Sequence, residues 1–144
     1  RRKEQGKVYI QTSKPDHFVI QQIVDHNYVG MYNNDIAERK SFDYPPYYRL
    51  VKISLKHKDP LLLSRLGSVV KQQLIAYFGD SLLGPEKPYV SKIRNWYILN
   101  FVLKIENNGP IVREQKRILA LAIDQLHKQK DFSQARIIVD VDPM

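Results

Sequence analysis

Apolar and polar residues alternate in three segments of the chain, at about 48–57, 96–106 and 135–142. A period of two predicts β-strands that bury one face and leave the other in water. The apolar positions expected to face a core are Val51, Ile53, Leu55, Leu99, Phe101, Leu103, Ile105, Ile137, Val139 and Val141. The polar positions expected on the wet face of the sheet are Lys52, Lys56, Asn100 and Lys104.

Apolar residues recur at helical spacing in the two segments that separate these strands. Asp59 before Pro60 is a typical cap followed by a first-turn proline, so a helix should run from there to about Phe78 and end at Gly79. The turn at 107–110 should open a second helix over about 111–128. The expected inward stripes are Leu62, Leu66, Val69, Val70, Leu74 and Tyr77 in the first helix, and Ile111, Ile118, Ala122 and Leu126 in the second.

The order of elements from Tyr47 onward is therefore strand, helix, one or two strands, helix, strand. The segment 80–95 is expected to be a loop, with room for a short strand near 89–93. Two helices must cover one face of a mixed or antiparallel sheet to bury their stripes, so the predicted fold class is α+β, an open-faced sandwich.

The N-terminal segment 1–43 predicts a strand at 7–12 and two helices, one beginning near Pro15 and one at about 28–40. So few elements cannot enclose a core, so we interpret 1–43 as the remnant of another domain. Tyr44-Pro45-Pro46-Tyr47 marks the junction, because consecutive prolines exclude helix. Residues 48–144 then form the α+β domain. The chain begins with Arg1 rather than methionine, which suggests a fragment of a larger protein.

Charge is concentrated in the predicted C-terminal domain. The chain has a net charge of +8, and residues 1–46 hold seven basic against six acidic side chains, whereas 47–144 hold sixteen against nine. Such an excess favours a polyanion or an acidic protein tail as partner, although a solvated basic surface would have the same composition. The absence of cysteine excludes disulfides and thiolate zinc sites and fits a reducing cytoplasm. No apolar run reaches membrane-spanning length.

The segment 84–104 combines prolines, cations and aromatic rings, the ingredients of sequence-tolerant nucleic-acid binding. The candidate nucleic-acid-binding residues are Lys52, Lys56, Lys87, Lys92, Arg94, Trp96 and Tyr97. The alternative is that Trp96 anchors the core and the cations only solvate a loop. The four histidines have no ligand spacing, so no metal site is expected. Asp140 and Asp142 are explained more simply by capping or an ion pair with Arg136 than by catalysis, and no catalytic residue is predicted.

Four segments in order resemble the C-terminal end of the bacterial replication-restart helicases of the primosomal protein N prime (PriA) family. GKVYIQTSKPDHFVIQQ is similar to the segment after the last helicase motif, and YPPYYRL to a Tyr-Pro-Pro-aromatic junction. GPEKPYVSKIRNWY resembles a Gly-Pro-x-x-x-Pro…Lys-x-Arg element, and VDVDPM a terminal Asp-Val-Asp-Pro. Together the matches cover nearly the whole chain, and the first of them implies that 1–43 is the end of the second helicase lobe.

The resemblance implies a parent ATP-dependent DNA helicase that uses ATP, magnesium and zinc, and a C-terminal domain shaped like a small-subunit ribosomal protein. The chain has no Gly-Lys-Thr/Ser loop, Asp-Glu-x-His motif or cysteine, so we expect this fragment to hold no cofactor and to be non-catalytic. On the same resemblance Arg1 would be the closing arginine of the final helicase motif and a cofactor-binding candidate.

The resemblance also implies that the last helix forms part of a pocket for the acidic C-terminal tail of the single-stranded-DNA-binding protein. Its candidate partner-binding residues are Arg113, Lys116 and Arg117, since a guanidinium can grip a carboxylate with two hydrogen bonds. An ordinary solvated helix face is the alternative.

The sequence therefore predicts a cytoplasmic, non-catalytic domain of a restart helicase that binds single-stranded or forked DNA, the single-stranded-DNA-binding protein and other primosome proteins, and no membrane. One rival is a structural docking module that never touches DNA, which would keep its behaviour when Lys92 and Arg94 become glutamate. The other rival is an RNA-binding, ribosomal-protein-like domain, which competition between single-stranded DNA and RNA would reveal.

Overall fold

A computed structural model describes residues 6–143, and the chain divides into two compact units between Glu38 and Arg39. The N-terminal unit contains helix α1 (Phe18–Val24) and most of helix α2 (Tyr28–Ser41). The second unit contains the sheet and two longer helices. The assignment of 1–43 to a helicase lobe stays a prediction, as do the boundaries of the junction and of the domain that follows it.

The two predicted helices of the N-terminal unit are present, each capped by a side chain. His17 Nδ1 accepts a hydrogen bond from Val19 N at 3.3 Å, and Asn27 Oδ1 accepts one from Gly30 N at 2.9 Å. Neither helix has a buried residue. The predicted strand at 7–12 is wrong: no strand is formed there, and Val8 is 88% exposed. A strand needs a hydrogen-bonded neighbour, and the described part of this unit offers none.

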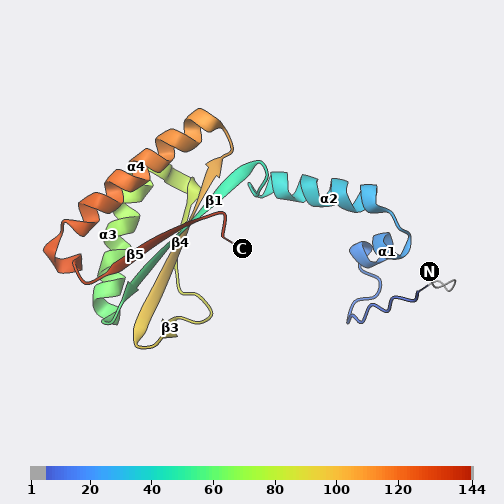
Figure 1. The fold of residues 1–144 in the computed structure, drawn as a ribbon, viewed down its shortest axis with the longest axis horizontal. Helices are drawn as coiled ribbons and strands as arrows, with labels where there is room; N and C mark the ends of the chain where they lie inside the picture. Colours follow the sequence, from blue (N-terminus) through green and yellow to red (C-terminus); the bar gives the residue numbers. More distant parts are fainter. Residues whose placement is uncertain (1–5, 144) are drawn as a thin grey trace. The chain divides into compact units, whose positions relative to one another are not determined.

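The C-terminal unit is a sheet in which every pairing is antiparallel. Its strand order is β2-β4-β1-β5, with β3 paired to β4 near the start of β4. The strands are β1 (Tyr48–His57), β2 (Leu82–Glu86), β3 (Lys92–Ile93), β4 (Trp96–Glu106) and β5 (Arg136–Val141). Helices α3 (Pro60–Phe78) and α4 (Gly109–His127) both lie on one side of the sheet (Figure 1). The predicted open-faced α+β fold is confirmed.

Helix α3 begins where the sequence predicts, because Asp59 Oδ1 accepts hydrogen bonds from Leu61 N at 2.7 Å and Leu62 N at 3.3 Å. Its predicted inward stripe is partly wrong at both ends of the helix. Near the start, Leu63 is buried, whereas Leu62 is only partly buried. Tyr77 is 65% exposed and Phe78 is buried in its place. The direction in which α3 crosses the sheet decides which of these two neighbours faces the core, and helical spacing alone does not determine it.

The core lies between the helices and one face of the two central strands. Val51, Ile53 and Leu55 of β1 and Leu99, Phe101, Leu103 and Ile105 of β4 are buried against both helices, as predicted. The expectation is wrong for Val139 and Val141, which are exposed because β5 is an edge strand. Burying such side chains contributes roughly 1.5–3 kcal/mol each. In α4 the residues Leu119, Ala122 and Leu126 are buried. Ile111 and Ile118, which were expected to point inward, are only partly buried.

The segment 80–95 is more ordered than predicted. A short 3-10 turn, η1 (Gly79–Ser81), leads into β2, and the pairing of β2 with β4 shifts register between Leu83 and Glu86. Gly84 sits in this irregular region with φ of 114°. A Cβ atom there would lie 2.8 Å from the carbonyl oxygen of Asn100, so only glycine lets β2 approach β4 this closely. A second 3-10 turn, η2 (Lys130–Phe132), precedes β5.

Candidate nucleic-acid interface

The face of the sheet away from the helices carries rows of side chains set by the pairing register. The rows, read from β5 through β1 to β4, are Arg136, Lys56 and Ile98; Ile138, Ser54 and Asn100; and Asp140, Lys52 and Val102. Ser54 Oγ donates to Asn100 Oδ1 at 2.9 Å. Lys52, Lys56 and Asn100 therefore lie on the uncovered face, where the alternation of the sequence predicts them. Lys52 lies opposite a carboxylate, whereas Lys56 lies opposite another cation.

Lys104 is on the same face but is held by the junction segment. Its Nζ donates to the carbonyl of Phe42 at 2.6 Å and lies 4.7 Å from the centroid of the Tyr44 ring. This ammonium group fastens residues 42–44 to the sheet. It is consequently less available to an external anion than Lys52 or Lys56.

Trp96 opens β4 and is surrounded by cations. The guanidinium carbon of Arg136 lies 4.4 Å from the centroid of the indole ring, and Lys58 Nζ lies 5.7 Å from it. Trp96 is half-buried, and it is absent from the core cluster. The interpretation of Trp96 as a core anchor is therefore wrong, because its ring packs against charged groups of the sheet surface.

The register of the short hairpin of β3 and β4 places on opposite faces of the sheet residues that were predicted to form one surface. Lys92 is paired directly with Tyr97, and its Nζ lies 4.8 Å from the centroid of that ring. Tyr97 packs against the core, so both side chains lie on the side of the helices. Trp96 pairs with Ile93 and lies on the opposite side. The cations of the Gly84–Lys104 segment thus reach two faces of the sheet.

Arg94 and Asn95 form the two-residue turn of this hairpin, with φ of 46° and 69°. Positive φ at both positions is the geometry of a type I′ turn, which favours asparagine and glycine over arginine. Lys87 lies in the preceding loop and lines, with Tyr97 and the first turns of α3, a cavity of about 390 Å³. Both cations are exposed.

The three cations predicted to bind a protein partner occupy different surroundings on α4. Arg113 is exposed. Lys116 borders an apolar groove of about 490 Å³ between α4 and β5, which includes Leu119, Ile123 and Val139. Arg117 is engaged by Glu114, because its Nη2 and Nε donate to the two carboxylate oxygens at 2.8 Å and 3.1 Å.

The Glu114–Arg117 pair perturbs both partners. The hydrogen bond from Arg117, helped by its positive charge, lowers the pKa of Glu114, and the same hydrogen bond raises the pKa of Arg117. Near the junction, the negative charge of Asp43 is the main cause of the raised pKa of Tyr48. These groups are at the surface, so the perturbations are local features.

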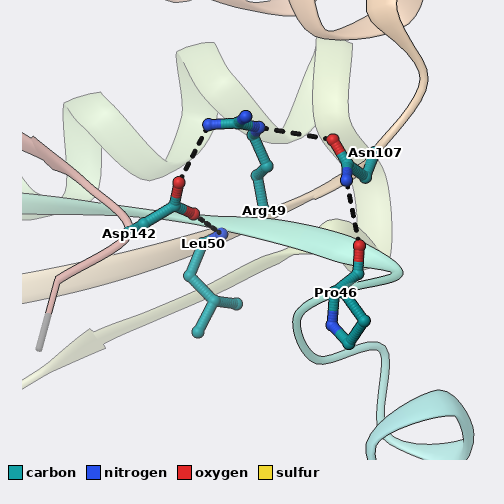
Figure 2. Close-up of polar contacts among 5 residues, drawn as sticks. All are labelled: Pro46, Arg49, Leu50, Asn107 and Asp142. Atoms are coloured by element: carbon teal, nitrogen blue, oxygen red, sulfur yellow. Dashed lines mark hydrogen bonds and ion pairs between the residues drawn. The ribbon is translucent and has the colours of Figure 1, made fainter.

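Asp142, which directly follows β5, is joined to Arg49 and Leu50 of β1 by a set of polar contacts that we call the Asp142 bracket (Figure 2). It accepts from Arg49 Nη1 at 2.9 Å and from Leu50 N at 3.3 Å, and its own N–H donates to Leu50 O at 2.7 Å. Arg49 Nε also donates to Asn107 Oδ1 at 3.3 Å, and Asn107 Nδ2 donates to Pro46 O at 3.0 Å. The expected alternative of an ion pair with Arg136 is wrong, because Arg136 stacks on Trp96 instead.

None of the candidate cations on the sheet and hairpin forms an ion pair with another described residue; these are Lys52, Lys56, Lys58, Lys87, Lys92, Arg94 and Arg136. Among residues 6–143, no three metal-ligating side chains gather in one place, and no helix is both long and apolar enough to cross a membrane. Arg1 lies outside the described residues.

Sequence reasoning missed Lys58 and Arg136. These two residues are 78 positions apart in the sequence, so their proximity becomes apparent only when the pairing of β5 with β1 is known. A signal was present in part, because Lys56 and Arg136 both belong to strands that were predicted. The order of the strands in the sheet, which places β5 beside β1, was the missing information.

Comparisons with known proteins agree on one family. A family model described as the primosomal protein N C-terminal domain matches residues 40–144. Replication restart protein PriA of Thermotoga maritima is 29% identical over 126 residues, covering 87% of this chain and 17% of that protein. The same-named protein of Bacillus subtilis is 26% identical over 144 residues, covering 99% and 17%. That of Chlamydia trachomatis is 30% identical over 143 residues, covering 96% and 18%. The chain thus spans less than a fifth of the length of these relatives.

Proposed function

The chain belongs to the primosomal protein N C-terminal domain family, and from this premise we propose that it is the non-catalytic C-terminal domain of a replication-restart DNA helicase. It binds single-stranded or forked DNA, and it binds the acidic tail of the single-stranded-DNA-binding protein while the primosome assembles in the cytoplasm. ATP, magnesium and zinc belong to other parts of the parent protein.

One observation carries the DNA-binding proposal. The uncovered face of the sheet carries Lys52, Lys56 and Trp96. Neither lysine forms an ion pair with a described residue. Unpaired cations beside an aromatic ring suit a phosphate backbone, because each phosphate contact releases condensed counterions. The hairpin cations Lys92 and Arg94 extend the positive surface around the end of β4.

The proposal is tested by fluorescence anisotropy of a labelled single-stranded oligodeoxynucleotide with the Lys52→Gln/Lys56→Gln variant. Each lost contact on a single strand reduces the salt slope by about 0.7, so two contacts are worth roughly 25-fold in affinity at about 0.1 M salt. The slope of log affinity against log salt should fall by about 1.4.

A matched control removes two charges from the opposite layer of the domain. Arg65 and Lys71 are exposed on α3, and the Arg65→Gln/Lys71→Gln variant changes the net charge by the same amount. It should bind DNA nearly as the parent chain does. If both variants lose affinity equally, the binding is only a net-charge effect and the assignment to the sheet face is incorrect. If the parent chain shows no salt-dependent affinity, the DNA-binding proposal itself fails.

Helix α4 supports the second half of the proposal. Arg113 is exposed, and Lys116 lies at the border of an apolar groove, a combination that suits a peptide with both carboxylates and apolar side chains. An acidic peptide with a free C-terminal carboxylate should bind at least tenfold more weakly to Arg113→Gln, because a charge-assisted hydrogen bond contributes about 1.5–3 kcal/mol. Arg65→Gln serves as the control, and equal binding by both variants would exclude this face of α4.

A docking role for the N-terminal unit is a second function, favoured by its own surface. A hollow of about 370 Å³ is lined by Phe18, Val19, Tyr28, Met31, Tyr32, Asp35 and Glu38, and both helices lack buried residues. Tyr32→Glu should weaken association with the remaining domains of the parent helicase, measured by co-purification, and should leave DNA affinity of the chain unchanged. Undiminished association would refute the docking role.

A further inference from the structure

Cations from two distant parts of the chain lie near Trp96: Lys58 and Arg136 at its ring, and Lys56 in the neighbouring row of the sheet. Lys58 follows the end of β1, and Arg136 begins β5, where it is paired directly with Lys56. The guanidinium of Arg136 lies 4.4 Å from the indole centroid, and Lys58 Nζ lies 5.7 Å from it. We refer to Lys56, Lys58, Arg136 and Trp96 as the Trp96 cluster.

The Trp96 cluster has no acidic partner among the described residues. Asp59, the carboxylate nearest in sequence, accepts the backbone N–H groups of Leu61 and Leu62 at the start of α3. Asp140 lies on the same sheet face but opposite Lys52, two rows away from Arg136. Like charges placed directly opposite each other on neighbouring strands destabilise a sheet. An anion is therefore the group that this arrangement lacks.

The geometry also indicates how the anion would be held. A guanidinium that lies over an indole ring is held in place by that contact, so less side-chain freedom is lost when its N–H groups bind two oxygens of a phosphate. The two lysines add point charges beside it. Ile98, on the same face and opposite Lys56, is buried, so part of the floor of the cluster is shielded from water.

We propose that the Trp96 cluster is a phosphate-binding subsite for the backbone of single-stranded DNA, in which Trp96 supports Arg136 and does not stack on a base. This inference rests on the proposed DNA-binding function and makes it more specific. It replaces the sequence-based expectation that Trp96 offers its ring to a nucleobase, because Arg136 already occupies a face of that ring.

Trp96 is the single tryptophan of the chain, beside nine tyrosines, so fluorescence excited at wavelengths that tyrosine does not absorb reports on this cluster. The full chain is titrated with oligodeoxythymidylate and with an abasic oligodeoxynucleotide of the same length. Both should change the Trp96 fluorescence with similar affinity, since the ligand is the phosphate backbone. Inorganic phosphate and a ribo-oligonucleotide are titrated in parallel to identify the preferred source of the phosphate group.

Variants at Arg136 provide the second arm, followed by anisotropy of labelled DNA. Arg136→Gln should weaken binding about fivefold at about 0.1 M salt and reduce the salt slope by about 0.7. Arg136→Lys keeps the positive charge but cannot donate two parallel hydrogen bonds to one phosphate. It should therefore retain the salt dependence of binding and lose part of the DNA affinity. Trp96→Phe should weaken binding only when Arg136 is present, because the ring acts through the guanidinium. Lys71→Gln is the control, and the urea midpoint of each variant confirms that it folds.

The two proposals fail differently. If anisotropy detects no DNA binding, the proposed function is refuted together with this inference. If anisotropy detects binding but the Trp96 fluorescence is silent, or if Arg136→Gln binds like the parent chain, only the subsite is refuted. A fluorescence change with oligodeoxythymidylate but not with the abasic strand would show base stacking and overturn the inference. Saturation by inorganic phosphate alone, with no gain from a strand, would assign the cluster to free phosphate instead.

Discussion

Replacing three glycines with alanine, one at a time, separates backbone strain from steric exclusion in this fold. Gly109 is the first residue of α4, and no atom beyond its two chain neighbours lies within 4 Å of a Cβ built there. Gly79 ends α3 with φ of 51° and also has open space around it. Gly84 has φ of 114°, and its added Cβ would meet backbone atoms of β4. The series therefore adds one cost at a time.

The expected changes in the free energy of unfolding follow from these environments. Gly109→Ala should change the free energy of unfolding by less than about 1 kcal/mol, because the better helix propensity of alanine is offset by the contact of its Cβ with the ring of Pro110. Gly79→Ala should cost about 1 kcal/mol. The backbone there, with φ of 51° and ψ of −131°, strains alanine by roughly 1–3 kcal/mol, and alanine offsets part of this cost by restricting the unfolded chain. Gly84→Ala should cost about 3 kcal/mol or more, because strain is added to overpacking against the central strand.

The steric cost of Gly84→Ala comes from two contacts with backbone atoms, which no side-chain rotation can relieve. The new Cβ would lie 2.8 Å from Asn100 O and 3.2 Å from Phe101 Cα, and both are backbone atoms of β4. Strand β2 would have to withdraw from β4 and lose part of their ladder. The loop that carries Lys87 would then move as well.

Urea unfolding followed by Trp96 fluorescence and by circular dichroism measures the series. With a slope of about 2 kcal/mol per M, typical of a small domain, the Gly84→Ala midpoint should fall by about 1.5 M and the Gly79→Ala midpoint by about 0.5 M. Gly109→Ala should shift the midpoint by less than about 0.5 M in either direction. If the midpoints of Gly84→Ala and Gly79→Ala coincide, the close approach of β2 to β4 is not what requires glycine.

Three further predictions concern polar groups. Arg94→Asn should stabilise the domain by about 1 kcal/mol, because asparagine tolerates the φ of 46° better than arginine; a lower urea midpoint would contradict this. Arg117→Gln should raise the pKa of Glu114 toward its ordinary value, measured by carboxyl NMR. Since the pKa of Glu114 is lowered in the folded state, the pair stabilises the fold at pH values above the ordinary glutamate pKa, and this stabilisation is lost as the pH falls through the folded-state pKa. An unchanged pKa of Glu114 in Arg117→Gln would refute the pairing. Asp142→Ala should cost about 1–2 kcal/mol, because it removes an exposed ion pair with Arg49 and a backbone hydrogen bond. Asp142→Asn should cost less, because its amide oxygen can still accept from Leu50 N; an unchanged urea midpoint in Asp142→Ala would show that the Asp142 bracket is not formed.

Long periodic segments were predicted well because their burial repeats along the chain. Strands β1 and β4 alternate over ten and eleven residues, and α3 begins at a cap and proline that act locally. The predicted strand at 7–12 failed for the opposite reason. Alternation over a few residues is compatible with a strand, but hydrogen bonding to a neighbour decides whether one forms.

The candidate site was only partly predictable from the chain. Lys52 and Lys56 were located on the uncovered face because period-two alternation assigns faces within a strand. Lys92 and Trp96 were grouped together on sequence proximity, and the hairpin register places them on opposite faces. Side chains four residues apart across a two-residue turn cannot be assigned to faces until the pairing is known.

The class of fold, the faces of the central strands, the start of α3 and the family resemblance could be predicted from the chain, because each depends on local spacing or on short matching segments. The folded domain was needed to show that Arg136 and Lys58 lie at Trp96, that Lys104 is held by the junction, and that Asp142 binds Arg49. These contacts join residues that are far apart in the sequence, and strand order and register, which bring such residues together, arise from packing of the whole domain.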